Sequence, residues 1–490
     1  MWRPPERIKH AAHPGRWPSA TEAQTSRLFS PVKVGPITLA ERTWVPAMVP
    51  WRATDEGFVT DDVLQWYERF ARGQPGVIVV EATGIRDVRS GPLLRAGHER
   101  FLPGLREIVS VVRRASGGRT RILIQLIDFL AIRRRPVPEK FFAQFLQIVP
   151  RHLDAYVAAT GAAVTPGPAA VREWLAALTR DQLELVLTTR ELEALDVGAR
   201  ERVTDTHLPH IAALPQTLPR DFARAAHLAR NAGFDGIELH FAHAYTMASL
   251  LSPLNARVDG YGGTRENRAR LPLEVYRAVR AAVDTDCAVG CRMLAEECIA
   301  DGGTIDDAAY FAREFASAGF DFLSLSRGGK FDDALQPKVG QAAYPYTGRS
   351  GYECMPSYYS DAQGPFGRNV AAAATIRATV REAGYATPIV TAGGVHNFEQ
   401  AEKLLRDNVT DIVGVARQAL ADPDWFRKIR TGHGEAVRLC IYTNYCEALD
   451  QRHRQVTCEL WDRVDLDAPG VRRSIDRKRR LVAPDWKSAP

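Results

Sequence analysis

Cysteine is scarce in this chain, which has 7 cysteines among 490 residues. So few cysteines in so long a chain exclude a disulfide scaffold and favour a reducing compartment. No apolar run approaches the roughly 18 residues that a membrane span needs, and the basic N-terminal segment lacks the apolar stretch of a secretion signal. We therefore expect a soluble, cytoplasmic protein without a membrane partner, in which residues 1–26 form a flexible basic leader.

An excess of charge of one sign is also missing, because the formal net charge of +6 is spread along the chain. The local basic runs are Arg133 to Arg135 and the tail from Arg472 to Arg480. Such runs are usually solvated faces, so no nucleic-acid partner is expected. The hydrophobic fraction of 45% is enough for a large core.

Apolar strand-like runs alternate with segments that carry apolar residues at three- and four-residue spacing. The strand-like runs are 43–48, 77–82, 122–127, 236–241, 288–293, 322–326, 388–393 and 411–416, and the helical segments are 60–72, 98–114, 219–232, 268–283, 305–318, 368–383, 397–406 and 422–430. Buried strands with crossover helices form parallel sheets, and this number of units most simply closes the sheet. The predicted fold is an α/β (β/α)8 TIM barrel over residues 27–435.

Two connections of this barrel are long. Residues 129–217, after the third strand, are a helical insertion, for which a lid, a binding wall and a dimer contact all stay open. Residues 328–367, after the sixth strand, are rich in tyrosine and form either an aromatic loop over the barrel mouth or a surface loop. Residues 436–490 are a short C-terminal extension.

The stretch 236–270, GIELHFAHAYTMASLLSPLNARVDGYGGTRENRAR, places His240, His243 and Tyr245 where a buried strand ends. Catalytic residues of such barrels lie at the C-terminal ends of the strands. Two imidazoles three residues apart can converge on one oxygen, and a phenol two residues on can reach the other face of a substrate. A metal pair is the alternative, but no third ligand stands at a suggestive spacing.

Other strand ends suit a phosphorylated ligand. Gly393 and Gly394 allow backbone N–H groups to approach an anion, and Arg417 can bind phosphate oxygens with two donors. Arg292 needs an anion beside it if it is buried. Gln125 offers both a donor and an acceptor, which suits a heterocycle that presents both.

Together these motifs resemble the old yellow enzyme family of FMN-dependent oxidoreductases, in particular its bacterial branch with 2,4-dienoyl-CoA reductase and trimethylamine dehydrogenase. The matching stretches are LFSPVKVGPITLAERTWVPAM, VIVVEATG, IQL, the 236–270 segment, CRM, TAGGV and VARQALADPDW. The resemblance implies one noncovalent FMN. By position, the resemblance implies that Pro46, Ala47, Met48 and Ala82 line the flavin ring and that Gln125 bonds its pyrimidine end. It implies that Arg292 lies near flavin N1 and O2. The phosphate site would consist of Gly393, Gly394, Ala416 and Arg417.

The same resemblance implies a reaction. His240 and His243 match the pair that holds a substrate carbonyl oxygen, and Tyr245 matches the proton donor. We therefore expect reduction of the activated C=C bond of an α,β-unsaturated carbonyl compound, an enone or an enoyl thioester, with NADPH or NADH as the reductant. Two alternatives stay open: an FMN-dependent amine dehydrogenase or demethylase that passes electrons to a partner carrier, and a flavin-free binding protein.

The sequence departs from the branch at its cysteine site. Thr443 stands where the second of four cluster ligands is expected, beside Cys440, Cys446 and Cys458. Three thiolates make a labile cluster at best, so no stable [4Fe–4S] centre is predicted. No Gly-x-Gly-x-x-Gly follows a strand, so either NAD(P)H reduces the flavin directly or a separate reductase does. A homodimer also stays open.

Val49 follows Met48 where the branch often has a small or polar residue, which bears on the redox potential. Asp128 stands where many relatives have a histidine. Both departures bear on the type of substrate.

Overall fold

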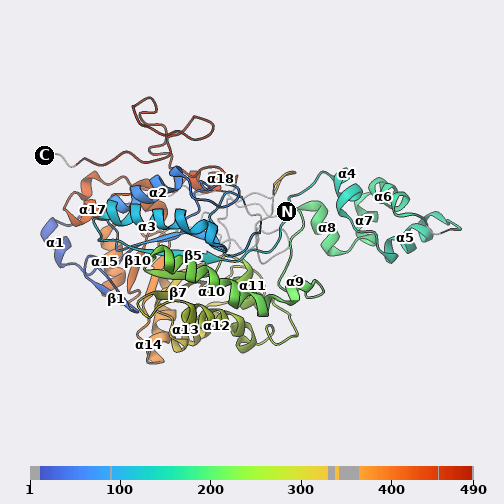
Figure 1. The fold of residues 1–490 in the computed structure, drawn as a ribbon, viewed down its shortest axis with the longest axis horizontal. Helices are drawn as coiled ribbons and strands as arrows, with labels where there is room; N and C mark the ends of the chain where they lie inside the picture. Colours follow the sequence, from blue (N-terminus) through green and yellow to red (C-terminus); the bar gives the residue numbers. More distant parts are fainter. Residues whose placement is uncertain are drawn as a thin grey trace.

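The computed structural model describes residues 11–88, 91–164, 166–328, 337–341, 364–450 and 452–487. Within these residues, parallel strands form a closed barrel in the order β3-β4-β5-β6-β7-β8-β9-β10, and β10 pairs with β3 (Figure 1). The strands are β3 (Thr43–Val45), β4 (Val77–Gly84), β5 (Arg121–Ile127), β6 (Gly236–Phe241), β7 (Ala288–Leu294), β8 (Leu323–Ser326), β9 (Ile389–Ala392) and β10 (Ile412–Gly414). This topology confirms the predicted (β/α)8 barrel. A hairpin of β1 (Val32–Val34) and β2 (Ile37–Leu39) precedes it.

The barrel strands are buried on both faces, as β4 and β6 show most clearly, because helices cover the outside of the barrel. These helices are α2 (Asp61–Arg72), α3 (Leu102–Ser116), α10 (Leu214–Ala232), α12 (Arg265–Ala282), α13 (Ile305–Ala318), α14 (Val370–Glu382), α15 (Phe398–Arg406), α16 (Arg417–Ala421) and α17 (Trp425–Arg430). Helix α2 illustrates the local signals. The Thr60 side chain caps its N-terminus by accepting from the Val63 N–H, and acidic residues occupy its first turn.

The long insertion forms a helical arm that extends away from the barrel (Figure 1). The arm (residues 138–196) contains α4 (Pro138–Lys140), a π-helical turn (Phe141–Phe145), α5 (Pro150–Thr160), α6 (Pro168–Ala177), α7 (Arg180–Val186) and α8 (Thr189–Asp196), and the short α9 (Pro209–Ala212) leads back to the barrel. Its apolar cluster around Phe142, Leu175 and Leu192 is separate from the barrel core. The arm therefore has its own small core.

The leader differs from the prediction of a flexible segment. Residues 20–25 form α1 (Ala20–Thr25), which Ser19 caps and whose Ala23 is buried. The Trp17 ring lies directly against Gly434. For residues 11–26 the prediction is therefore wrong, because apolar side chains bind this segment to the barrel.

The C-terminal extension also packs on the barrel. Its helix α18 (Tyr445–Asp450) lies at the barrel mouth. Beyond it, the buried Trp461 donates its indole N–H to the Leu420 carbonyl at 2.9 Å, and Arg52 donates to the Leu481 carbonyl at 2.6 Å.

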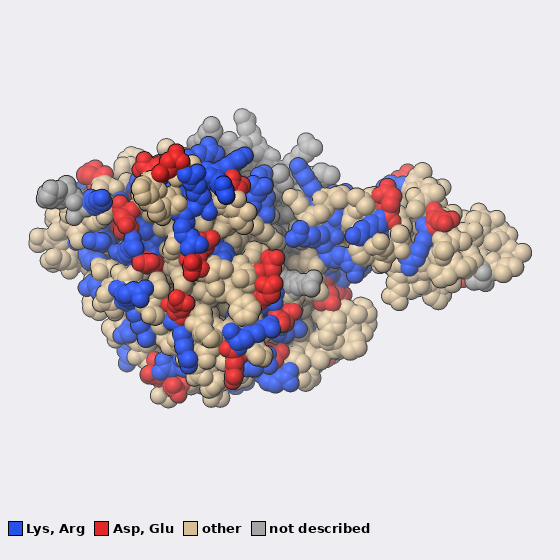
Figure 2. All heavy atoms as spheres, turned by 45° about the horizontal axis from the view of Figure 1, so that its top comes forward, with Lys and Arg blue, Asp and Glu red and all other residues tan. Residues whose placement is uncertain are grey.

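The described helices include none with the length and apolar character that crossing a membrane requires. Lys and Arg are interspersed with Asp and Glu over the visible face of the barrel, and the outer end of the arm is largely uncharged (Figure 2). This face therefore has no extended surface of one charge.

Candidate active site

A cavity of about 1230 Å³ opens at the C-terminal ends of the barrel strands. Every site residue that the sequence analysis predicts lines this one cavity: Pro46, Ala47, Met48, Ala82, Gln125, His240, His243, Tyr245, Arg292, Gly393, Gly394, Ala416 and Arg417. They come from strands far apart in the sequence, and closure of the barrel brings them together. The tyrosines expected in residues 344–359 lie outside the described residues.

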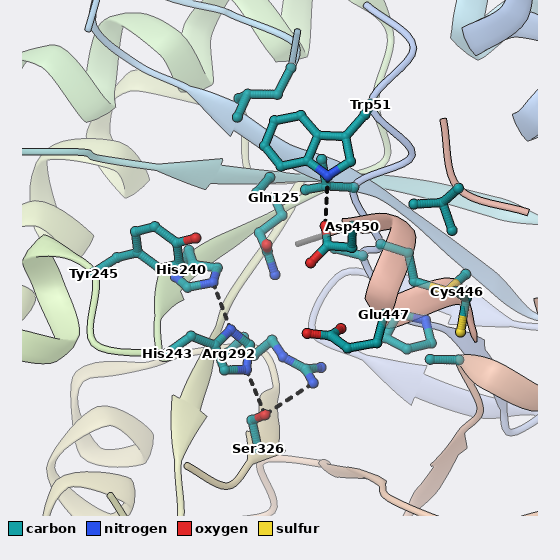
Figure 3. Close-up of a pocket in the computed structure, with 18 of the residues that line it drawn as sticks. Trp51, Gln125, His240, His243, Tyr245, Arg292, Ser326, Cys446, Glu447 and Asp450 are labelled. Atoms are coloured by element: carbon teal, nitrogen blue, oxygen red, sulfur yellow. Dashed lines mark hydrogen bonds between the residues drawn. The ribbon is translucent and has the colours of Figure 1, made fainter. Parts of the chain in front are cut away.

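The histidine pair sits at a sharp turn after β6. His243 and Ala244 have φ values of 56° and 58°, in the left-handed region that non-glycine residues seldom adopt. This turn directs His243 and Tyr245 toward His240 (Figure 3). The Tyr245 ring meets His240 edge-on, with centroids 5.3 Å apart.

The two imidazoles are linked to each other. His240 Nε2 lies 3.1 Å from His243 Nδ1, and His243 Nε2 lies 2.7 Å from Ser326 Oγ. The rings thus hydrogen-bond each other, whereas the sequence analysis expected both to point at one ligand oxygen. For the two imidazoles to hold a substrate oxygen, that oxygen must take the place of the present partner in one of these hydrogen bonds.

The protonation of these groups follows from burial. Burial, assisted by the nearby Arg292 guanidinium, lowers the pKa of His240 to about 3, so this imidazole is neutral. Burial raises the pKa of Tyr245, and the Asp450 and Glu447 carboxylates raise it further. The phenol therefore keeps its proton at neutral pH and is able to donate it.

A buried polar network orients Gln125. Its Nε2 donates to Glu238 Oε1 at 2.6 Å, and both side chains are buried. Because the amide nitrogen is directed to Glu238 Oε1, the Gln125 carbonyl is available to an N–H donor of a ligand. Arg292 donates to Ser324 Oγ at 3.4 Å and to Ser326 Oγ at 3.2 Å. Burial lowers the pKa of Arg292, and the charge of Glu238 acts in the opposite direction.

The glycine turn after β9 has no room for side chains. Gly394 has a φ of 70°, and a Cβ there would lie 1.9 Å from the Pro365 carbonyl oxygen. Arg417 starts the helix after the next strand, donates to Asn444 Oδ1 at 2.9 Å and lies 4.7 Å from the centroid of the Tyr442 ring. Close-approach glycines next to a guanidinium fit a phosphate, and the cavity has room for a flavin, so these residues fit FMN.

The cysteine site of the extension lies beside the cavity. Cys446 lines it, while the hydroxyl of Thr443 donates to Glu459. Burial raises the pKa of Cys446, and it raises the pKa of Cys458 to about 12, so both are thiols at neutral pH. Within the described ranges, no group of three or more His, Cys, Asp and Glu side chains is arranged to hold a metal ion. The absence of a stable cluster stays a prediction.

Sequence reasoning missed one wall of the cavity. Glu447 and Asp450 of α18 reach into it opposite Tyr245 and His240, next to Trp51 (Figure 3). Trp51 Nε1 donates to Asp450 Oδ1 at 2.7 Å, and His453 stacks on the indole at 4.1 Å. No sequence pattern signals a contact between residues so far apart.

The fold and the cavity agree with the similarity of this chain to known proteins. Residues 215–435 match the sequence model of the NADH:flavin oxidoreductase / NADH oxidase family. The NADH oxidase of Thermoanaerobacter brockii is 26% identical over 85% of this chain and 52% of its own length. The NADPH dehydrogenase of a Geobacillus species is 29% identical over 81% of this chain and 92% of its own.

Among solved structures, a 2-naphthoyl-CoA reductase aligns with a TM-score of 0.64 at 19% identity, over 90% of this chain and 57% of that one. The chain spans about half the length of several curated relatives that it matches, the NADH oxidase among them. The matched range includes the 236–270 segment and the predicted phosphate ligands Gly393, Gly394, Ala416 and Arg417, and the fold is the one that the motifs predict. This chain is therefore similar to the NADH:flavin oxidoreductase / NADH oxidase family over residues 215–435, and its fold agrees with that similarity.

Proposed function

We propose that this protein is an FMN-dependent oxidoreductase that reduces the activated C=C bond of an α,β-unsaturated carbonyl compound at the expense of NAD(P)H. The observation that carries the proposal is the set of His240, His243 and the protonated Tyr245 at one side of a cavity whose other residues fit a flavin phosphate. FMN, when bound, supplies a hydride acceptor for NAD(P)H and a hydride donor for the alkene.

The flavin would be held by three groups of residues. The glycine turn at Gly393 and Gly394, together with Arg417, would hold the phosphate. Gln125, which Glu238 orients, would accept from an N–H of the ring, and Arg292 would place a positive charge beside the ring. Pro46, Ala47, Met48 and Ala82 would form an apolar surface against the flavin ring.

The substrate would be polarised and protonated by the chain itself. His240 and His243 would hold its carbonyl oxygen, and the neutral state of His240 makes this imidazole a hydrogen-bond donor without a charge of its own. Tyr245 would deliver a proton to the α-carbon from its hydroxyl. For this step the raised pKa of Tyr245 ensures that the proton is present.

An anaerobic absorption experiment tests the proposal. The purified protein should show a flavin spectrum that NADPH or NADH bleaches and that cyclohexenone restores. Tyr245→Phe should lower enone turnover by about 10²- to 10⁴-fold with flavin still bound. Tyr261→Phe is the matched control, because Tyr261 bonds Glu274 outside the cavity and should leave turnover unchanged.

Two results would contradict the proposal. Full enone turnover in Tyr245→Phe would show that Tyr245 is not the proton donor. Bleaching by amines but not by NAD(P)H would instead support amine oxidation, and a colourless protein that takes up no FMN would support a binding role.

A further inference from the structure

The basic run Arg133 to Arg135 has no part in the reaction proposed above. It lies between β5 and α4, where the arm leaves the barrel (Figure 1). This segment precedes residues 215–435, which match the family model, so its side chains belong to the insertion and not to the matched motifs. Ile132 and Arg134 both line the active-site cavity. The root of the arm therefore contributes directly to the site.

Backbone hydrogen bonds on both sides fix the position of this run. The Arg133 N–H donates to the Ala199 carbonyl at 2.7 Å, where the chain returns from the arm. The Arg135 N–H donates to the Gln341 carbonyl at 2.8 Å. The residue between them is thus held from two directions, and its side chain starts from a fixed point.

The side chains of the run alternate between the cavity and the arm. Ile132 forms an antiparallel bridge with Arg200, so the backbone there is extended, and successive side chains of an extended segment point to opposite sides. Ile132 and Arg134, two positions apart, accordingly line the cavity. The Arg133 guanidinium instead lies 4.5 Å from the centroid of the Phe145 ring, on the arm.

The guanidinium of Arg134 has donors to spare. The side chain is exposed, and it donates to the Gly340 carbonyl at 3.2 Å. Within the described ranges it forms no ion pair. Arg95 and Arg327, which also line the cavity, do have carboxylate partners. Since a guanidinium carries five N–H donors, Arg134 retains both charge and donors for a ligand.

An apolar surface connects Arg134 with the proposed proton donor. The Phe129 ring meets the Tyr245 ring edge-on, with centroids 5.2 Å apart. Phe129, Leu130 and Ile132 line the cavity between that point and Arg134. Five residues separate Phe129 from Arg134, so their Cα atoms are at most about 18 Å apart. A ligand with its reacting end at Tyr245 can thus lay an apolar body along this surface and reach the guanidinium with its other end.

We propose that Arg134 is an anion subsite of the cavity, which binds a phosphate or carboxylate group of a ligand whose reacting end lies at Tyr245. The inference rests on the proposed function, because the ligands in question are those of that reaction. Two of them can carry such an anion: the nicotinamide dinucleotide through its phosphates, and the unsaturated substrate through a carboxylate. A guanidinium binds either anion with two parallel N–H donors.

The test compares charged with uncharged ligands by calorimetry, in the protein as purified with its flavin. One pair is the non-reducing tetrahydro form of NADPH and N-benzyl-tetrahydronicotinamide, which lacks phosphate. The other pair is a cyclohexenone with a carboxylate at the end of a flexible alkyl chain, and its methyl ester. Arg134→Gln should weaken the charged member of at least one pair by about tenfold or more. The uncharged member of that pair should bind as before.

The two pairs distinguish the source of the anion. A loss confined to the dinucleotide pair assigns the subsite to a phosphate of the reductant, and a loss confined to the enone pair assigns it to a carboxylate of the substrate. Because Arg134 is exposed, salt should reduce the advantage of the charged ligand in the unaltered protein.

Arg133→Gln is the matched control. It removes the same charge one residue away, from a side chain that stacks on Phe145, and should leave both pairs unchanged. Four results would overturn the subsite: unaltered protein that binds neither charged ligand better than its partner, Arg134→Gln without effect on either pair, equal weakening of charged and uncharged ligands, and equal weakening by Arg133→Gln.

The proposed function and the subsite fail separately. If Arg134→Gln removes the preference for a charged ligand but the unaltered protein does not reduce the enone, the subsite stands and enone reduction does not. If the enone is reduced and Arg134→Gln changes no dissociation constant, the reverse holds.

Discussion

Gly394→Ala is the sharpest test of the proposed phosphate site. Gly394 has a φ of 70°, and a methyl group there would lie 1.9 Å from the Pro365 carbonyl oxygen and 2.7 Å from Phe366 Cα. Both neighbours are backbone atoms, so no side-chain rotation relieves the contact. Gly384 is a natural control, because it has a φ of 86° with nothing within 4 Å of the added methyl group.

The two substitutions share one energetic term and differ in another. Each alanine costs about 1–2 kcal/mol because an L-residue is strained in the left-handed region. Only Gly394→Ala must also move the backbone, by about 1 Å or more to reach ordinary contact. A displacement of that size in the phosphate cradle should weaken FMN binding by about tenfold or more, which is about 1.4 kcal/mol.

The assay is a titration of flavin-free protein with FMN, followed by flavin fluorescence, with thermal midpoints measured in parallel. Gly384→Ala should lower the midpoint and leave the FMN dissociation constant unchanged. Gly394→Ala should lower the midpoint and raise the dissociation constant. Unchanged FMN affinity in Gly394→Ala, or equal weakening in both variants, would refute the assignment of the phosphate to this turn.

Three further predictions concern other parts of the structure. Glu238→Gln should weaken FMN binding by about tenfold in the same titration, because an amide at position 238 both donates and accepts and so no longer fixes the orientation of the Gln125 amide; full affinity would contradict the orienting role of Glu238. His240 has a folded pKa of about 3, below its ordinary value, so it stabilises the fold less as pH falls from about 6.5 toward 3. His240→Asn should therefore lose about 2 kcal/mol less than the unaltered protein between pH 8 and pH 5 in urea unfolding, and an equal loss would count against a neutral buried imidazole. Replacing the arm by a glycine-rich turn should leave the flavin spectrum intact, because Arg133 and Ala199 already pair at 2.7 Å at its root; light scattering of the same variant tests the arm as a dimer contact.

The sequence by itself predicted the barrel and the residues that line its cavity. Buried strands such as β6 and amphipathic helices such as α2 are encoded by local periodicity, which can be recognised without knowledge of the fold. Once the sheet is parallel and closed, the C-terminal ends of all strands meet at one mouth. That is why Gln125, Arg292 and Gly394, far apart in the sequence, were predicted to lie together.

Local signals misled at the leader. The basic, proline-containing leader predicted flexibility, but Trp17 and Ala23 pack on the barrel. Their packing partners lie on other elements, which the local sequence does not reveal. The His-x-x-His spacing predicted two donors aimed at one oxygen, and this stays a prediction; in the structure His240 and His243 bond each other, and His243 bonds Ser326.

Only the tertiary structure decided the charge of the cavity wall. Trp51 and Asp450 are 399 positions apart, and their contact depends on how the C-terminal extension folds back over the barrel mouth. The same holds for Glu238, whose partners Gln125 and Arg292 come from neighbouring strands. The kind of chemistry follows from residues at strand ends, whereas the ligand that this cavity accepts depends on long-range contacts that no local pattern encodes.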